Sequence, residues 1–171
     1  SLLEQYLTAS RKIAELAVGD LRQDALSNIY KVPPDAPQGH HLPGLPLGSR
    51  GGTLIEHNFP LDGEYDFDSY LTRNIVGYMT GLEWSHQFEI SIDGEQVFLK
   101  QVGGEADNLM SDTNFADAAD TIDQRLKVRI PVEAGLHRIA VTFIQKNSAE
   151  THEPLELHTR DLDLQNMTGL P

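Results

Sequence analysis

The sequence contains no cysteine among its 171 residues. This absence excludes disulfide bonds, thiolate zinc sites, cysteine nucleophiles and haem attached covalently through a Cys-x-x-Cys-His motif. Long apolar runs are also missing, and none approaches the roughly 20 residues that a membrane-spanning helix needs. We therefore expect no membrane span.

Basic residues are scarce: 13 lysines and arginines face 26 acids, which gives a formal charge of −13. A field of that sign repels phosphate backbones and anionic membranes, so we exclude nucleic acid as a partner. Neutral ligands, cations and basic partners remain compatible with it. The hydrophobic fraction of 39% and the chain length suit one soluble domain with a real core.

The clearest local pattern is a β-hairpin over His86–Val102. Phe88, Ile90 and Ile92 fall at every second position with polar residues between them, which is typical of a strand with one buried face. The dipeptide Asp93-Gly94 then supplies a two-residue turn of the kind that needs positive φ at both positions. This ribbon is the element around which we expect the other strands to pack.

Further strands are predicted by the same alternation, without helices between them. The fold class that we predict is all-β, an antiparallel, jelly-roll-like β-sandwich preceded by an N-terminal α-helix over residues 2–18. A long acidic loop is expected at Gly103–Asp123, with a helical turn near Asn114–Ala119. The additional strands are Thr53–Phe59, Glu64–Arg73, Arg125–Val132, His137–Ile144 and Leu155–His158.

The pattern divides the chain into three parts. Residues 1–31 are predicted as an N-terminal helical segment, the end of a preceding domain. Residues 32–51 hold clustered proline and glycine and are predicted as a linker or an irregular wrap. Residues 52–171 are predicted as the β-sandwich module.

The predicted acidic loop is the first candidate site. No lysine or arginine occurs between Gly104 and Asp123, so a bound divalent cation would relieve the repulsion among the acids and order the loop. Calcium takes six to eight oxygen ligands, although the spacing here does not match an EF-hand. The alternative is a mobile acidic loop without metal. The metal ligands that we predict are Glu105, Asp107, Asp112, Asp117 and Asp120.

A second acidic set, Asp62, Glu64, Asp66 and Asp68, alternates along a predicted strand. Residues spaced by two project to one face of a strand. Carboxylates gathered in this way supply calcium sites in other proteins. A solvated strand face explains the pattern equally simply, and it is the interpretation that we favour.

The third candidate site combines Tyr78, Glu83, Trp84 and His86. Sugar-binding surfaces use aromatic faces for stacking and carboxylates or amides for the hydroxyl groups. Trp84, which is the one tryptophan of the chain, fits either such a platform or a core anchor at the entry to the hairpin. His86 taken alone is more typical of a structural histidine.

Two glycine-rich motifs give the chain a family resemblance. They are Gly44-Leu-Pro-Leu-Gly-Ser-Arg-Gly-Gly52 and His57-Asn-Phe-Pro-Leu-Asp-Gly-Glu-Tyr65. With them, and with the segments Leu2–Ala17, Phe88–Val97, Val132–His137 and Val141–Phe143, the chain resembles a module of the large secreted, planctomycete-type proteins that carry c-type cytochrome domains.

The resemblance implies an exported module, periplasmic or extracellular, inside a multidomain protein whose haem belongs to another domain. The middle segment is loosely similar in layout to calcium-dependent, xylan-binding carbohydrate modules. The expected partners are therefore a polysaccharide, xylan-like in this comparison, and neighbouring domains of the same polypeptide.

From these observations we expect a non-catalytic, calcium-dependent carbohydrate-binding module. Ser49-Arg50-Gly51 is not a nucleophile elbow, and no phosphate-binding loop occurs. One alternative is a structural module that holds neighbouring domains in register and has no ligand. A glycoside hydrolase is the weaker alternative, since it needs two carboxylates facing each other across a cleft.

Overall fold

The computed structural model describes residues 2–18, 27–33, 38–39 and 41–145. Contacts divide the chain into two compact units, residues 1–31 and residues 32–171, and each is described by itself. The predicted strand Leu155–His158 lies outside the described residues.

The first unit contains helix α1, Leu2–Val18, which confirms the predicted N-terminal helix. A helix of this length is only marginally stable alone in water, because most helical stability comes from packing an apolar face. No described helix of the chain is long and apolar enough to cross a membrane. Five large apolar side chains of α1 are exposed: Leu2, Leu3, Tyr6, Leu7 and Ile13.

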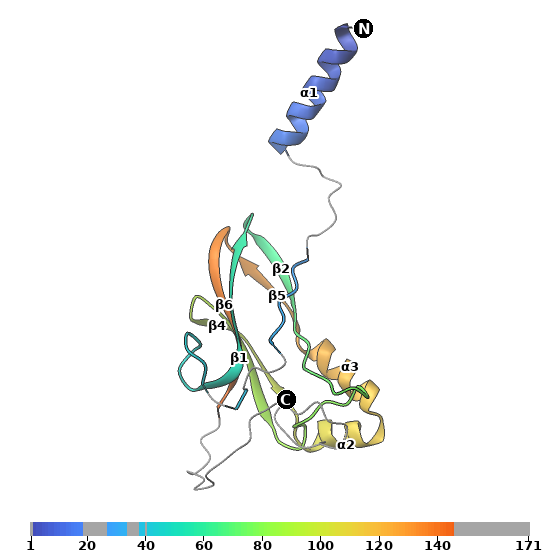
Figure 1. The fold of residues 1–171 in the computed structure, drawn as a ribbon, viewed down its shortest axis with the longest axis vertical. Helices are drawn as coiled ribbons and strands as arrows, with labels where there is room; N and C mark the ends of the chain where they lie inside the picture. The colour runs from blue at the N-terminus through green and yellow to red at the C-terminus, as the bar shows by residue number, and fades with distance from the viewer. Residues whose placement is uncertain (1, 19–26, 34–37, 40, 146–171) are drawn as a thin grey trace. The chain divides into compact units, whose positions relative to one another are not determined.

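The second unit is built on two antiparallel sheets (Figure 1). The larger sheet has the order β1-β6-β3-β4 and the smaller pairs β2 with β5. This confirms a β-rich fold with an N-terminal helix. The strands are β1 Ser49–Phe59, β2 Gly63–Asp68, β3 His86–Ile92, β4 Glu95–Val102, β5 Lys127–Val132 and β6 Gly135–Ile144.

The predicted hairpin is confirmed as β3 and β4. Its turn has positive φ at both central residues, 52° at Asp93 and 87° at Gly94, as the dipeptide predicted. The other edge of β3 pairs with β6, so that Phe88 lies opposite Phe143 and Ile90 opposite Val141.

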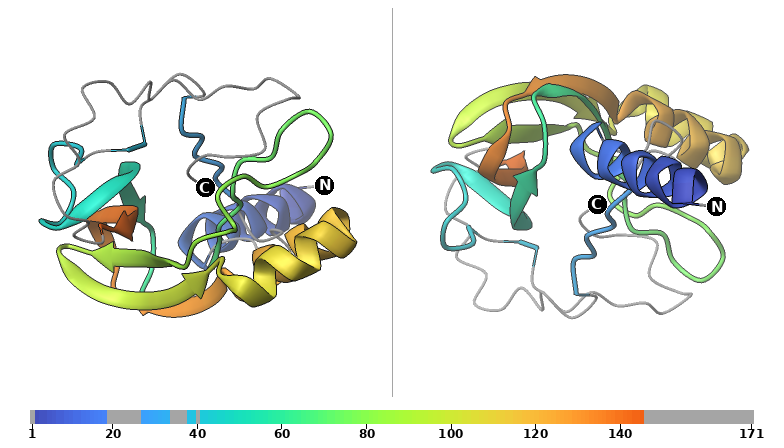
Figure 2. Two further views of the ribbon diagram at one scale, coloured as in Figure 1. Left: turned by 90° about the horizontal axis from the view of Figure 1, so that it is seen from below. Right: turned by 90° about the horizontal axis from the view of Figure 1, so that it is seen from above.

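The segment predicted as an acidic loop is instead a helical hairpin. Helix α2 spans Glu105–Thr113 and helix α3 spans Phe115–Arg125, side by side in Figure 2. The fold is therefore β-rich rather than all-β. The helical turn expected near Asn114–Ala119 lies at the start of α3, but the prediction of a loop over the rest of Gly103–Asp123 was wrong.

The physical reason is a helical repeat that the density of acids conceals. Ala118, Ile122 and Leu126 recur at the four-residue step of one helix face, and all three are fully buried. Asn114 begins α3 as its N-cap, because its side-chain oxygen accepts hydrogen bonds from the N–H groups of Ala116 and Asp117.

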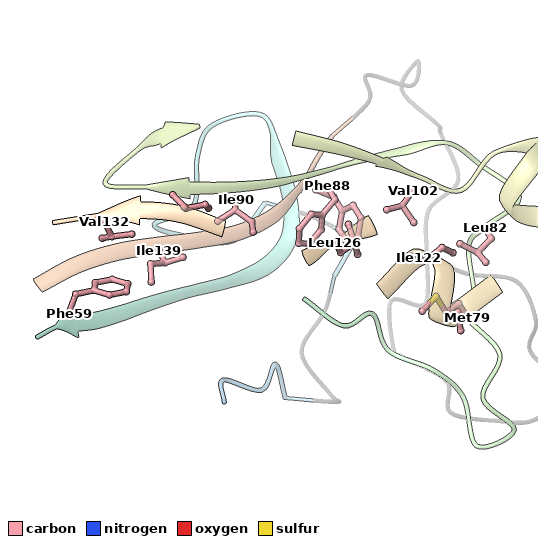
Figure 3. Packing of buried hydrophobic residues seen from close by; sticks show 13 residues of the cluster. Phe59, Met79, Leu82, Phe88, Ile90, Val102, Ile122, Leu126, Val132 and Ile139 are labelled. Atoms are coloured by element: carbon pink, nitrogen blue, oxygen red, sulfur yellow. The ribbon is translucent and has the colours of Figure 1, made fainter. Parts of the chain in front are cut away.

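One hydrophobic core draws on both sheets, on α3 and on the connection between β2 and β3 (Figure 3). Phe59, Val132 and Ile139 lie at one end of the cluster, and Met79 and Leu82 at the other. The helical hairpin therefore completes the core beyond the end of the sheets. The cluster comprises Phe59, Met79, Leu82, Phe88, Ile90, Val102, Ala119, Ile122, Leu126, Ile130, Val132, Ile139 and Phe143.

A glycine bulge interrupts the pairing of β1 with β6. Gly52 has φ 95°, and a Cβ there would lie 2.0 Å from the carbonyl oxygen of Val141. Its N–H donates to the Oε1 atom of Gln38 at 2.6 Å. The segment predicted as a linker or wrap thus packs against the sheet at Gln38, and its last residues already belong to β1.

We expect Gly52→Ala to lower the free energy of unfolding by at least about 2 kcal/mol more than Gly48→Ala does. Gly48 is the matched control, since its φ is 80° and a Cβ there would meet nothing within 4 Å. Denaturant titration of both variants measures the difference. Equal losses would mean that the close approach to β6 has no energetic role.

The hairpin turn is joined to β6 through Asp93. The Oδ1 atom of Asp93 accepts the N–H of Arg138 at 2.9 Å, and its Oδ2 atom lies 2.6 Å from Nδ1 of His137. The hydrogen bond from Arg138, followed by that from His137, lowers the pKa of Asp93 below its ordinary value of 3.8.

A carboxyl with a lowered pKa stabilises the fold at pH values above its unfolded pKa, and this contribution is lost as the pH falls through the folded value. We therefore expect Asp93→Asn to flatten the loss of stability below about pH 4. Asparagine keeps the tolerance of positive φ, so the turn survives. Thermal melts across the acid range test this, and an unchanged acid limb would contradict it.

Candidate functional site

The candidate site centres on the connection between β2 and β3, residues 69–85, which carries most of the predicted sugar-binding residues. It runs beside α2 and α3 in Figure 1. Met79 and Leu82 fix it to the core, each with 1% of its surface exposed. The carbonyl oxygen of Leu82 also accepts the N–H of Gly104 at 2.8 Å, at the start of α2.

Trp84 lies on this fixed base with its side chain in solvent. Its residue surface is 70% exposed, so the alternative of a core anchor is wrong. Its backbone is closely packed, because a Cβ at Gly103 would lie 2.2 Å from the Trp84 carbonyl oxygen. The indole is thus an exposed aromatic face on a chain segment with little freedom to move.

Asp107, a predicted metal ligand, has a different role. It is 5% exposed. Its Oδ2 atom accepts the N–H of Gly103 at 2.7 Å, and its Oδ1 atom pairs with Arg125 at 2.7 Å. This carboxylate therefore joins both helices to the glycine that packs against Trp84.

The other four predicted ligands are exposed, and the structure distributes them along two helices. Asp117 accepts from the side chain of Asn114 at 2.6 Å, and Asp120 lies 3.4 Å from Arg73. Within the described ranges, no three acidic or histidine side chains come together in a group that could hold a metal ion. As placed, the acids do not fit calcium, which needs six to eight oxygens. Calcium binding stays a prediction.

A second buried carboxylate, Asp123, ties the 69–85 segment to α3. It forms an ion pair with Arg73. Burial raises the pKa of Asp123 above its ordinary value, and this effect outweighs the opposing influence of Arg73. The cations that compensate the acidic stretch are Arg73 and Arg125. The composition of Gly104–Asp123 does not reveal them, because both lie outside that stretch.

Tyr78 belongs to a tight turn that begins at Asn74. The Oδ1 atom of Asn74 accepts the N–H groups of Val76 and Tyr78 at 3.1 Å and 2.9 Å. The carbonyl oxygen of Tyr78 accepts the N–H of Asn74 at 2.9 Å. Tyr78 is half-buried there, and Glu83 is half-buried next to Trp84 in the chain.

His86 contacts two other segments of the chain. The guanidinium of Arg50 lies 2.9 Å from Nδ1, and the carbonyl oxygen of Gly81 lies 3.0 Å from Nε2. Arginine can only donate, so Nδ1 accepts and the proton sits on Nε2. Arg50 is buried against the ring of Phe143, and burial lowers its pKa. In the sequence, Arg50 belongs to the glycine-rich motif Gly44–Gly52, but nothing in that motif indicates its contact with His86.

The acids of β2 form a solvated face, as the favoured interpretation predicted. Asp66 makes a two-pronged pair with Arg129 across to β5, at 2.7 Å and 2.9 Å. A shallow depression of about 530 Å³ lies on this face, lined by Asp66, Asp68, Lys127, Val128 and Arg129. Trp84 does not line this depression.

Comparisons with protein-family models, with curated proteins and with solved structures found no match to this chain.

We expect Asp107→Ala to destabilise the fold by about 3 kcal/mol, because it leaves the partly buried Arg125 and the Gly103 N–H without their partner. Asp107→Asn is the matched variant. It keeps an oxygen for Gly103 but no charge for Arg125, so its loss should be smaller. Denaturant titration measures both. A wild-type-like Asp107→Ala would show that the buried pair does not fix this junction.

Proposed function

We propose that this chain carries a non-catalytic carbohydrate-binding module of an exported multidomain protein. The observation that carries the proposal is the 70% exposure of Trp84 above a tightly packed backbone. An indole face offers a large, rigid surface on which the C–H groups of a sugar ring can stack. Glu83, next to it in the chain, supplies a carboxylate for ring hydroxyls.

The finer fold assignment is part of this proposal. We take the two sheets as the layers of a jelly-roll-like sandwich. Phe59 of β1 meets Tyr65 of β2 edge to face at 4.6 Å, and the core draws on both sheets. The two glycine-rich motifs carry the resemblance to exported planctomycete-type modules. A neutral, xylan-like polysaccharide is the ligand class most compatible with a charge of −13.

A structural role between neighbouring domains is the second candidate. The observation that favours it is the exposed apolar face of α1, whose large side chains are uncovered in the first unit. Exposed apolar patches of this kind mark contact surfaces. Such a module would bind no glycan, so the experiment below separates the two candidates.

The test is retention on insoluble xylan, cellulose and chitin. We expect the wild-type protein to bind at least one of them. Trp84→Ala should weaken binding about tenfold or more, because loss of a stacked aromatic removes about 1.4 kcal/mol. Tyr70→Ala is the matched control, since Tyr70 is another exposed aromatic at 65%. Retention on none of the polymers, or equal binding by Trp84→Ala, would overturn the proposal.

A calcium arm tests the metal separately. The melting temperature in calcium should be higher than that in chelator if the acids of α2 and α3 bind the ion. A hundredfold excess over the dissociation constant adds about 2.7 kcal/mol of stability. An unchanged melting temperature would contradict calcium dependence. Glycan binding is then tested by the pull-down alone.

A further inference from the structure

The turn at Asn74–Tyr78 holds apolar side chains in solvent by means of an ordered backbone. Four hydrogen bonds close it: two from N–H groups to the Asn74 side chain and two between the backbones of Asn74, Gly77 and Tyr78. Yet Ile75 is 68% exposed and Val76 is 47% exposed at its tip. A preorganised apolar tip is a feature of binding surfaces, because little entropy is lost when it is covered.

Both ends of this turn are anchored to the folded unit. Arg73, just before it, pairs with the buried Asp123 of α3. Met79, just after it, is 1% exposed and belongs to the core. Arg73 and Met79 also form a backbone bridge with each other. The exposed tip is therefore a fixed part of the surface.

The first residue of α3 extends the apolar tip. A Cβ at Gly77 would lie 3.6 Å from the ring of Phe115, and Phe115 is 42% exposed. Ile75, Val76 and Phe115 form the turn patch. Three large apolar side chains are thus exposed around one rigid turn.

Exposed acids of α3 make up what we call the acidic rim of the turn patch. The contact that places them there is that of Asp120, which lies 3.4 Å from Arg73, the residue just before the turn. Asp117 and Asp120 follow Phe115 along α3, and both are exposed. Arg73 is shared between Asp120 and Asp123, so these three groups together keep a net negative charge. No lysine or arginine lies between Gly104 and Asp123 to balance Asp117.

We propose that the turn patch is a docking site for a basic amphipathic segment of a partner protein, one whose apolar side chains are flanked by lysine or arginine. The apolar tip supplies the central contact and the acidic rim selects the charge of the partner. The proposal is independent of glycan binding at Trp84.

The same charges argue against other occupants. A second copy that docked on this patch through the same surface would bring Asp117 and Asp120 against their own equivalents, and like charges repel. An anionic membrane is repelled for the same reason. A basic segment gains from both the apolar contact and the rim.

The probe is a synthetic helical peptide of about 18 residues, with leucines on one face and lysines on the other. One control peptide replaces its lysines by glutamate, and a second replaces its leucines by serine. Fluorescence anisotropy should show that only the basic peptide binds. Its affinity should fall as the salt concentration rises from about 50 to 200 mM, because salt screens the charges. Equal binding of the glutamate peptide, or no binding of the basic one, overturns the proposal.

Variants locate the contact. The double change Ile75→Ser with Val76→Ser should weaken peptide binding at least about tenfold. Asp117→Asn with Asp120→Asn should reduce the salt dependence. Leu61→Ser, an equally exposed control at 71%, and Trp84→Ala should bind the peptide as the wild type does. Thermal melts establish that each variant is folded.

Two results would assign the patch to another occupant and contradict the proposal. One is a wild-type dimer in sedimentation that Ile75→Ser with Val76→Ser dissociates, which points to a second copy. The other is binding of the wild type, but not of this double variant, to phosphatidylserine vesicles. Unchanged peptide binding by the folded double variant would also contradict it.

Discussion

The helical hairpin depends on two buried carboxylates that find cationic partners outside their own stretch of sequence. Asp107 and Asp123 would each be strongly destabilising if unpaired inside the fold. Arg125 and Arg73 make their burial possible, and each pair joins separate elements. The first connects α2 with α3, and the second connects α3 with the segment between β2 and β3. An acid-rich stretch can therefore pack Ala118, Ile122 and Leu126 into the core instead of remaining an extended, self-repelling loop.

The two exposed features of the second unit follow from this arrangement. Trp84 is fixed because Gly103, which packs against its backbone, donates to Asp107. The turn patch is fixed because Arg73 and Met79 hold both ends of its turn. The same hairpin thus supports an aromatic platform and an apolar tip, while its remaining acids face solvent and set the sign of the surrounding field. A negative surface of this kind suits neutral sugars and basic protein segments.

Local patterns in the sequence predicted the elements whose signals are local. The alternation of Phe88, Ile90 and Ile92 and the dipeptide Asp93-Gly94 led directly to β3, β4 and their turn. The helical repeat of Ala118, Ile122 and Leu126 was equally local, but the density of acids around it was given more weight, and the segment was predicted as a loop. The pairing of Asp107 and Asp123 was not predictable in this way, because it depends on which arginines the fold brings near. The tautomer of His86 likewise depends on a contact between distant segments, the one with Arg50.

The central claim is that residues 103–125 form a rigid, internally paired unit. Native-state amide hydrogen exchange tests it most directly, because it reports the free energy of opening at each N–H. The account predicts that the Gly103 N–H and the amides of α3 exchange as slowly as those of β3 and β6. The claim would be contradicted if the Gly103 N–H and the α3 amides exchanged as fast as those of an open acidic loop while the strands stayed protected.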